Sequence, residues 1–361
     1  MTITACEIAE LNIKLKKPFI TALRRVECVN DIIIKIHTDT EFFGYGEACA
    51  VTAITGVTNE QVRKELQQTV FPFLLQQDID EITIFTKLYA LEVSTETKAC
   101  VDIALYDLLA KQYKKSLHSY LGSTSSVLQT DLTISVNEPK QMQEDTIDAL
   151  AQGFNILKIK LDKDIDKNIQ RLEAINMLLS SEYTLRLDPN QSLDLQSCLS
   201  MLLSINLENI ECIEQPFNAK DIKSMKLLKD KGLVPVLADE SIFDADDAKK
   251  LLKDEAADML NIKLMKCGGI HEAIAIAKLS KQYGKECMIG SMLEGPISLL
   301  AAAHFGLSQD NISMADLDSP LYLKNHPLLE PFHLEKDFIH LNNEPGLGID
   351  TIMEKLKLFK D

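Results

Sequence analysis

Seven polar residues stand at nearly even intervals in the second half of the chain, each at or just after the end of a short apolar run. Successive members are 28, 26, 25, 24, 28 and 25 residues apart. This is about the length of one strand, one helix and their two connections, so the spacing predicts a β/α barrel with its polar strand ends at one active site. The seven residues are Lys160, Asp188, Glu214, Asp239, Lys263, Ser291 and Asp316.

Three carboxylates in the middle of this series predict a site for a divalent cation. Asp188, Glu214 and Asp239 would come from three successive strand ends, and neighbouring carboxylates repel each other unless a cation lies among them. An all-oxygen set of ligands suits Mg²⁺ better than Zn²⁺, so we expect one Mg²⁺ per subunit. Taken singly, each acid also has an ordinary interpretation, as a turn residue, a loop acid or a helix cap.

Lysines flank the three acids, and their placement predicts proton transfer. A cation bound to a substrate carboxylate stabilises the enediolate that forms when the adjacent carbon loses its proton. With Lys160 on one face of that carbon and Lys263 on the other, one could remove the proton and the other return it, which inverts the carbon. A lysine that acts as a base needs a lowered pKa. Lys158, on the same strand face as Lys160, would help to lower it. The structural alternative is a set of strand-end lysines that extend to solvent.

The elements that must position these residues alternate regularly from about residue 128. Apolar runs of strand length alternate with amphipathic stretches, which predicts the fold class α/β and a (β/α)7β TIM-like barrel. The expected strands are 131–136, 155–161, 184–188, 210–214, 234–238, 258–263, 286–290 and 313–317. The expected helices are 138–152, 165–179, 194–205, 220–231, 245–253, 270–283 and 296–308.

The chain before the barrel has a different order, with strands first and helices afterwards. This order predicts an α+β N-terminal capping domain, completed by a C-terminal tail that packs back onto it. The expected strands there are 3–15, 29–36 and 42–46, and the expected helices are 59–69 and 96–114. The expected domains are 1–125 for the capping domain, 126–324 for the catalytic barrel and 325–361 for the tail.

The composition and net charge argue against some classes of binding partner. The formal net charge of −16 argues against nucleic acid and against anionic membranes as partners. No run of 18 apolar residues and no basic segment followed by an apolar one is visible, so we expect neither a membrane span nor a secretory signal and predict a cytoplasmic protein. The eight cysteines contain no C-x-x-C pair and are expected to be reduced and mostly buried.

The motifs together resemble the enolase superfamily, in its muconate-lactonizing subgroup. The resemblance extends from about residue 3 to residue 350 and implies the barrel, the capping domain and a metal on the three acids. By analogy with that family, Lys160 would serve the R substrate and Lys263 the S substrate. The matching motifs are Lys158-Ile159-Lys160, Asp188, Glu214 in Glu-Gln-Pro, Asp239 in Asp-Glu-Ser, and Lys263 five residues before Gly268-Gly269.

Within that subgroup the chain is most similar to the dipeptide epimerases, in particular those acting on L-Ala-D/L-Glu. The resemblance implies that Asp316 and Asp318 receive the free ammonium of a dipeptide substrate. It also implies that Arg24 meets the glutamate side chain, although its neighbour Arg25 could reach the same group. A role in recycling murein peptides would follow. The further substrate-binding residues that the resemblance implies are Thr133, Lys158, Ser291 and Leu293.

Two other functions remain open from the sequence. A cycloisomerase or an o-succinylbenzoate synthase would use the same metal and lysines, but its substrates carry no ammonium for the acid pair at 316 and 318. A non-catalytic dipeptide-binding protein would keep the pocket without turnover. A homo-oligomer is also reasonable, because the barrel helices are expected to be exposed. The strictness of the preference for glutamate stays open.

Overall fold

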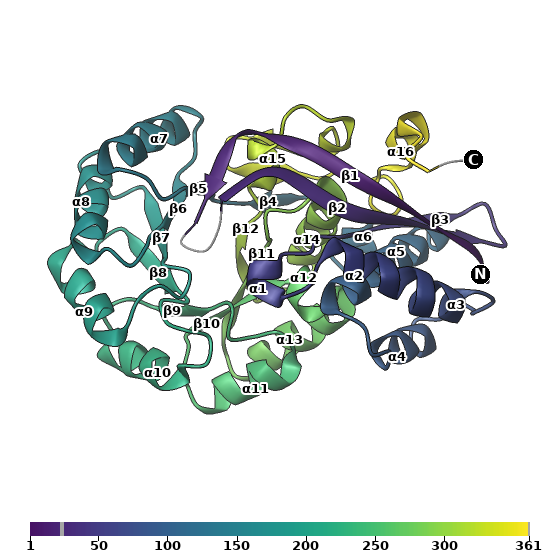
Figure 1. The fold of residues 1–361 in the computed structure, drawn as a ribbon, viewed down its shortest axis with the longest axis horizontal. Coiled ribbons are helices and arrows are strands. Elements are labelled where there is room, and N and C mark those ends of the chain that lie inside the picture. The colour runs from purple at the N-terminus through teal and green to yellow at the C-terminus, as the bar shows by residue number, and fades with distance from the viewer. Residues whose placement is uncertain (22–24, 360–361) are drawn as a thin grey trace.

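The computed structural model describes residues 1–21 and 25–359. Eight parallel strands form a nearly closed barrel in sequence order, and the antiparallel sheet of the capping domain lies beside it (Figure 1). The two edge strands of the barrel approach each other where Asp131 N donates a hydrogen bond to Ala315 O, at 3.3 Å. The barrel strands are β5 (Leu132–Ile134), β6 (Ile156–Lys160), β7 (Thr184–Asp188), β8 (Ile210–Glu214), β9 (Val236–Ala238), β10 (Met259–Lys263), β11 (Glu286–Gly290) and β12 (Ile312–Asp316).

Helices cover the outside of the barrel, and several begin at an aspartate. In α8, α9, α10 and α11 the side chain of the N-cap aspartate accepts a hydrogen bond from the backbone N–H three residues later, which satisfies one of the free donors of the first turn. The helices are α7 (Pro139–Ala151), α8 (Ile165–Asn176), α9 (Leu195–Ser204), α10 (Ile222–Lys231), α11 (Ala245–Lys253), α12 (Leu264–Cys267), α13 (Ile270–Gln282), α14 (Pro296–Gly306) and α15 (Ser319–Tyr322).

The capping domain packs one long helix, α5 (Thr95–Gln112), against a three-stranded sheet. The sheet consists of β1 (Ile3–Ile20), β2 (Arg25–Thr38) and β3 (Phe43–Ala48). Helix and sheet approach so closely that a Cβ at Gly46 would lie 1.8 Å from Cys100 O, which explains the glycine. The shorter elements are α1 (Thr52–Thr55), α2 (Asn59–Glu65), the π-helical turn η1 (Leu66–Val70), α3 (Phe71–Leu74), α4 (Thr83–Tyr89) and α6 (Leu117–Tyr120).

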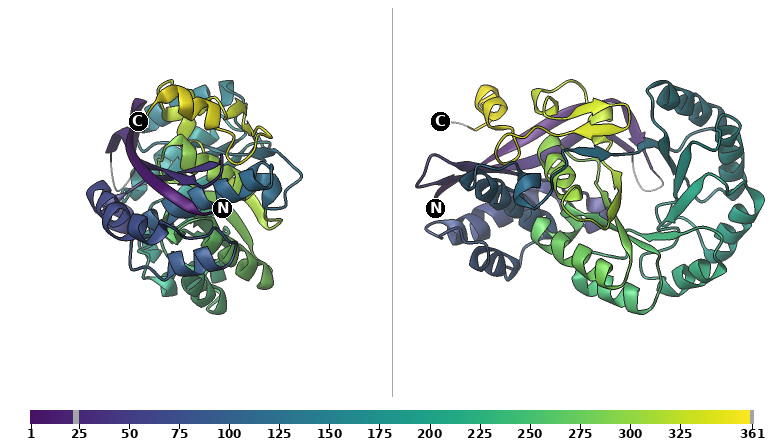
Figure 2. Two further views of the ribbon diagram at one scale, coloured as in Figure 1. Left: turned by 90° about the vertical axis from the view of Figure 1, so that its right-hand side faces the viewer. Right: turned by 180° about the vertical axis from the view of Figure 1, so that it is seen from behind.

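The first two strands extend beyond this sheet as an arm that reaches across the mouth of the barrel (Figures 1 and 2). Lys14 pairs with Cys28 and Phe19 with Val26, so five positions along β1 match two along β2 and β1 carries a bulge between them. The sequence prediction ended this strand at residue 15, because the bulge interrupts the alternation of apolar and polar residues. The tip of the arm joins the barrel where Val136 N donates to Ile20 O, at 3.3 Å.

The C-terminal tail packs back onto the capping domain, as predicted. Asp350 lies 2.6 Å from the Nζ of Lys111 on α5, and Leu347 N donates to Asp107 Oδ1 on the same helix at 2.8 Å. The tail also pairs with β4, a strand outside the barrel that the sequence prediction missed. These elements are β4 (Val127–Gln129), the 3-10 turn η2 (Pro327–Leu329), β13 (His333–Glu335), β14 (Phe338–His340) and α16 (Asp350–Leu356).

The predicted fold class is confirmed, and each of the eight predicted strands and seven predicted helices overlaps an observed one. The domain limits at residues 125 and 324 stay predictions. None of the eight cysteines, all of which the structure describes, forms a disulfide, and six are buried. In the described part of the chain, no helix has both the length and the apolar character needed to span a bilayer.

Candidate functional site

The evenly spaced polar residues meet at one end of the barrel, as their spacing predicted. Five are the last residue of a strand, Lys160, Asp188, Glu214, Lys263 and Asp316. The other two, Asp239 and Ser291, come directly after β9 and β11. All except the half-buried Ser291 are buried, so their charges must be balanced within the site.

Lys158 lies among the carboxylates. Its Nζ is 2.6 Å from Glu214 Oε2, 2.7 Å from Asp316 Oδ2 and 3.1 Å from Asp188 Oδ2. Burial alone would lower the pKa of Lys158, but the surrounding carboxylates outweigh it and raise the pKa well above its usual value. This ammonium therefore stays charged and draws the acids of three strands together.

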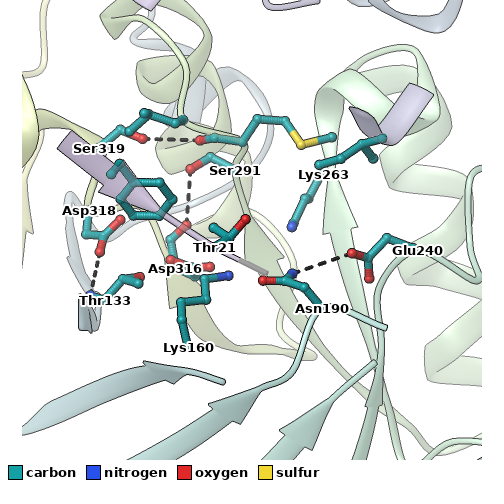
Figure 3. A pocket seen from close by; sticks show the side chains of 14 residues that line it. Thr21, Thr133, Lys160, Asn190, Glu240, Lys263, Ser291, Asp316, Asp318 and Ser319 are labelled. Carbon is teal, nitrogen blue, oxygen red and sulfur yellow. Dashed lines mark hydrogen bonds between the residues drawn. The ribbon is translucent and has the colours of Figure 1, made fainter. Parts of the chain in front are cut away.

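The two candidate bases point into the same pocket from different sides (Figure 3). Lys160 Nζ lies 2.5 Å from Asp188 Oδ2, and Lys263 Nζ lies 2.7 Å from Asp239 Oδ2. The expectation of a lowered pKa is wrong for Lys263 in this structure. Burial lowers its pKa, but attraction by Asp239 and Glu214 is larger in sum and raises it.

The three predicted metal ligands converge on this group of ammonium ions. Burial alone would raise the pKa of both aspartates. Lys160 and Lys158 nevertheless hold the pKa of Asp188 below its usual value, and Lys263 and Lys266 do the same for Asp239. The pKa of Glu214 is raised to about 7, by burial and by repulsion from Asp188.

The surroundings of Glu214 test whether the three predicted ligands fit a metal ion. Its Oε1 accepts a hydrogen bond from Asn261 Nδ2 at 2.8 Å, whereas its buried Oε2 has no hydrogen-bond partner and only the charge of Lys158 nearby. A buried carboxylate oxygen that is balanced only by the ion pair with Lys158, on a strand between two further carboxylates, belongs to a donor set that fits a hard divalent cation. The three residues therefore fit Mg²⁺.

A second acid cluster offers another metal candidate. One oxygen each from Asp131, Asp316 and Asp318 lies within 4.8 Å of the others. However, the guanidinium of Arg186 is buried and lies 2.8 Å from Asp131, and Lys158 contacts Asp316. The three predicted ligands contact buried cations in the same way, through Lys158, Lys160, Lys263 and Lys266, so charge alone does not separate the two candidate sites.

The pocket contains about 580 Å³ of empty space, counted out to its open mouth. Asp316 and Asp318 both line this pocket (Figure 3), and their pKa values are shifted in opposite directions. Lys158 and Lys160 overcome the effect of burial and lower the pKa of Asp316 to about 2, whereas burial and repulsion from Asp316 raise that of Asp318 to about 6. The lining also includes Phe19, Thr21, Ile54, Thr133, Asn190, Glu240, Ser291, Met292, Leu293 and Ser319.

Two arginines were candidates for contact with the substrate side chain. Arg24 lies outside the described residues, and only Arg25 is described. Arg25 pairs across the arm with Ile20, on the strand face opposite to Phe19, and its Nε lies 3.1 Å from Glu27. Together with Ile20 it lines a neighbouring cavity, so its side chain is not part of the pocket that contains the lysines.

Several residues of the site were missed from the sequence. Lys266 Nζ lies 2.5 Å from Asp239 Oδ1, and its position three residues after Lys263 was a usable signal. Tyr322 donates to Asp318 Oδ2 at 3.0 Å or to Thr133 O at 2.6 Å, and no sequence pattern pointed to it. Asn190 and Glu240 each follow a predicted ligand closely and face the pocket.

Two family models match the chain. Residues 3–122 match the mandelate racemase/muconate lactonizing enzyme N-terminal domain, and residues 141–355 match the enolase C-terminal domain-like family. Together they cover both parts of the fold described above.

Individual relatives match over almost their whole length. The L-Ala-D/L-Glu epimerase of Clostridium acetobutylicum is 39% identical, with 98% of this chain and 99% of that protein covered. The substrate-liganded L-Ala-D/L-Glu epimerase of Bacillus subtilis has a TM-score of 0.91 and 35% identity, with 96% of this chain and 98% of that chain covered. The Enterococcus faecalis V583 dipeptide epimerase, complexed with Mg and L-Leu-L-Tyr, has a TM-score of 0.92 and 33% identity, with 96% and 99% covered. The fold, the arrangement of the strand-end residues and these matches show that the chain belongs to the mandelate racemase/muconate lactonizing enzyme family of the enolase superfamily.

Proposed function

We propose that the protein is a Mg²⁺-dependent dipeptide epimerase that inverts the α-carbon of the C-terminal residue of L-Ala-L/D-Glu. One observation carries the proposal, namely two lysine amines that enter one pocket from different sides, each held by a predicted metal ligand. The relatives at 34 to 39% identity include epimerases of L-Ala-D/L-Glu, of L-amino acid-D/L-Glu and of hydrophobic dipeptides, which supports the same chemistry.

The remaining charges suit the two ends of a dipeptide. Asp316 and Asp318 would bind its ammonium, because two buried carboxylates beside each other attract a cation strongly. Lys158 would add positive charge beside the terminal carboxylate. Thr133, Ser291 and Leu293 would form the wall between these ends.

The proton would move between the substrate and the two lysines. Mg²⁺ bound by Asp188, Glu214 and Asp239 would supply positive charge next to the substrate carboxylate, which stabilises the charge formed when the α-proton leaves. Lys160 would remove the proton from the R epimer and Lys263 from the S epimer, each as a neutral amine. The opposite lysine, as an ammonium, would then donate a proton to the other face, so inversion leaves the total number of protons unchanged.

The side chain of the C-terminal residue separates two candidate substrates. Arg24, which resembles the arginine of the L-Ala-D/L-Glu epimerases, favours glutamate. The apolar wall formed by Phe19, Ile54, Met292 and Leu293 favours a hydrophobic dipeptide, as in the relative named hydrophobic dipeptide epimerase. We place L-Ala-Glu first, because the sequence resemblance includes this arginine, and an arginine can form a charge-assisted pair with the glutamate carboxylate.

The experiment is incubation of the purified protein with Mg²⁺ in D₂O and a panel of L-Ala-Xaa dipeptides. We expect deuterium to enter at the C-terminal α-carbon, fastest with Glu, together with formation of the other epimer. Faster exchange with L-Ala-L-Leu or L-Leu-L-Tyr would select the hydrophobic candidate. Tight binding without exchange across the panel would identify a binding protein. The absence of both binding and exchange would favour a cycloisomerase or synthase, whose substrates carry no ammonium.

Substitution of Asp318 tests the ammonium site. Asp318→Asn removes one of the two charges while an oxygen can still accept the hydrogen bond that Thr133 N now donates at 2.6 Å. Loss of a charged hydrogen bond costs about 1.5–3 kcal/mol, so we expect KM for L-Ala-L-Glu to rise about 10- to 100-fold with a smaller change in kcat. N-acetyl-L-Ala-L-Glu, which has no ammonium, is the control. If its KM rises as much as that of the free dipeptide, Asp318 does not bind the ammonium.

The wider setting belongs to the same proposal. The resemblance to L-Ala-D/L-Glu epimerases supports a role in recycling murein peptides. The strongly acidic chain and the family suggest a cytoplasmic enzyme, and a homo-oligomer would use the exposed barrel helices.

A further inference from the structure

Two buried carboxylates of the capping domain cap two successive barrel helices. Asp102, on α5, accepts hydrogen bonds from Ile270 N at 2.5 Å and from His271 N at 3.3 Å, at the start of α13. Glu47, on β3, accepts from Ile297 N at 2.8 Å and Ser298 N at 2.9 Å, at the start of α14. Lys263 comes shortly before α13 in the chain, whereas α14 follows β11, which carries no candidate base. Only the helix capped by Asp102 therefore lies next to a candidate base.

The short segment between Lys263 and α13 fits closely against the capping domain. Tyr89 donates from its hydroxyl to Gly268 O at 2.7 Å and lies 3.2 Å from Asp102 Oδ2. Gly269 has a φ of +124°, and a Cβ there would lie 2.4 Å from Asp102 Oδ1. Any shift of the Asp102 side chain would therefore displace the backbone of this segment.

The same segment contacts the site on its other side. Lys266, in α12, donates to Asp239 Oδ1 at 2.5 Å and also to the backbone O of Asp239. The second oxygen of Asp239 lies 2.7 Å from Lys263 Nζ. A continuous series of contacts thus leads from the capping-domain carboxyl through the start of α13 and α12 to the amine of Lys263. Lys160 lies at the end of β6, four strands away from β10 in the barrel.

We propose that Asp102 is a positioning residue for Lys263, so that the capping domain adjusts the base on one face of the substrate and not on the other. This inference rests on the proposed two-base reaction. A base that is displaced by a fraction of an ångström loses much of its rate, because proton transfer requires hydrogen-bond distance to the α-carbon proton. The displacement would leave the opposite lysine where it is.

The test compares the two faces within one protein. Each epimer, L-Ala-L-Glu and L-Ala-D-Glu, is incubated with holoenzyme in D₂O, and the initial loss of its α-proton signal is followed by NMR. With Asp102→Ala, we expect the exchange of the L,L epimer, assigned to Lys263, to fall about tenfold more than that of the L,D epimer. Asp102→Asn should recover part of this ratio, since burial raises the pKa of Asp102 to about 8 and the amide matches its neutral form while it keeps one acceptor.

Glu47→Ala is the matched control, because it removes the same kind of cap from α14, which follows a strand without a base. We expect it to lower both exchange rates by the same factor. Tyr89→Phe is a milder variant that keeps the test available if Asp102→Ala does not fold, and it should shift the ratio in the same direction.

The outcomes are distinct. An unchanged ratio in folded Asp102 variants, or an equal shift in the Glu47 variant, would show that Asp102 has only a structural role. Absence of exchange in the unsubstituted protein would instead refute the proposed function itself.

Discussion

Replacement of either Lys160 or Lys263 by alanine is expected to stop epimerisation while one epimer still exchanges its α-proton. Each amine enters the pocket from its own side and is held by its own carboxylate, so neither can replace the other. A general base or acid contributes about 10²- to 10⁴-fold, so the rate of inversion should fall by that factor in each variant. Lys160→Ala should keep exchange of the L,L epimer, and Lys263→Ala should keep that of the L,D epimer.

The measurement combines NMR in D₂O for exchange with separation of the epimers for inversion. Lys249→Ala, at an exposed position on α11, is the control and should behave as the unsubstituted protein. Inversion that persists in both active-site variants would contradict the two-base assignment. Loss of exchange from both epimers in each variant would show that the lysines act as a single unit.

Removal of divalent cations with EDTA is expected to abolish turnover, and Mg²⁺ should restore it. Three buried carboxylates at the ends of neighbouring strands supply oxygen ligands of the kind that Mg²⁺ prefers, so turnover should depend on this ion. Glu214→Gln removes the charge of a predicted ligand. Titration calorimetry should show that Mg²⁺ binding weakens at least as much as on loss of an outer-shell partner, about 10- to 100-fold.

Asp131→Asn tests which of the two acid clusters binds the metal. Asp131 pairs with Arg186 below the pocket and is not among the predicted ligands, so its substitution should leave the affinity for Mg²⁺ within a few-fold of the original. A greater loss in Asp131→Asn than in Glu214→Gln would assign the metal to the cluster of Asp131, Asp316 and Asp318 instead. Calorimetry reads binding directly and does not depend on turnover.

The strand ends could be predicted because a barrel repeats a unit of nearly constant length. The spacing alone therefore predicted that Lys160, Asp188 and Glu214 lie at strand ends, where the structure has them. The contacts around them could not be predicted. Lys266 reaches Asp239 because a single turn of helix, α12, follows β10, and the sequence prediction did not include this turn.

Charge states were harder to predict than positions. The sequence places lysines among acids but does not give the distances that decide whether burial or attraction is larger. For Lys263 attraction is larger, and its pKa is raised where the chemistry requires a base. Arg25 shows a similar limit, because the register of the arm turns its side chain away from the pocket.

The bulge in the first strand has a consequence for how such an enzyme changes its substrate. Side chains alternate between the two faces of a strand. The number of residues in the bulge between Lys14 and Phe19 therefore determines whether Phe19 or Ile20 faces the mouth of the barrel. Deletion of one residue there would exchange the faces of Phe19 and Ile20 without any change in the barrel. An insertion or deletion more than a hundred residues before Lys160, the first of the two proposed bases, could thus alter selectivity while the residues proposed for proton transfer stay unchanged.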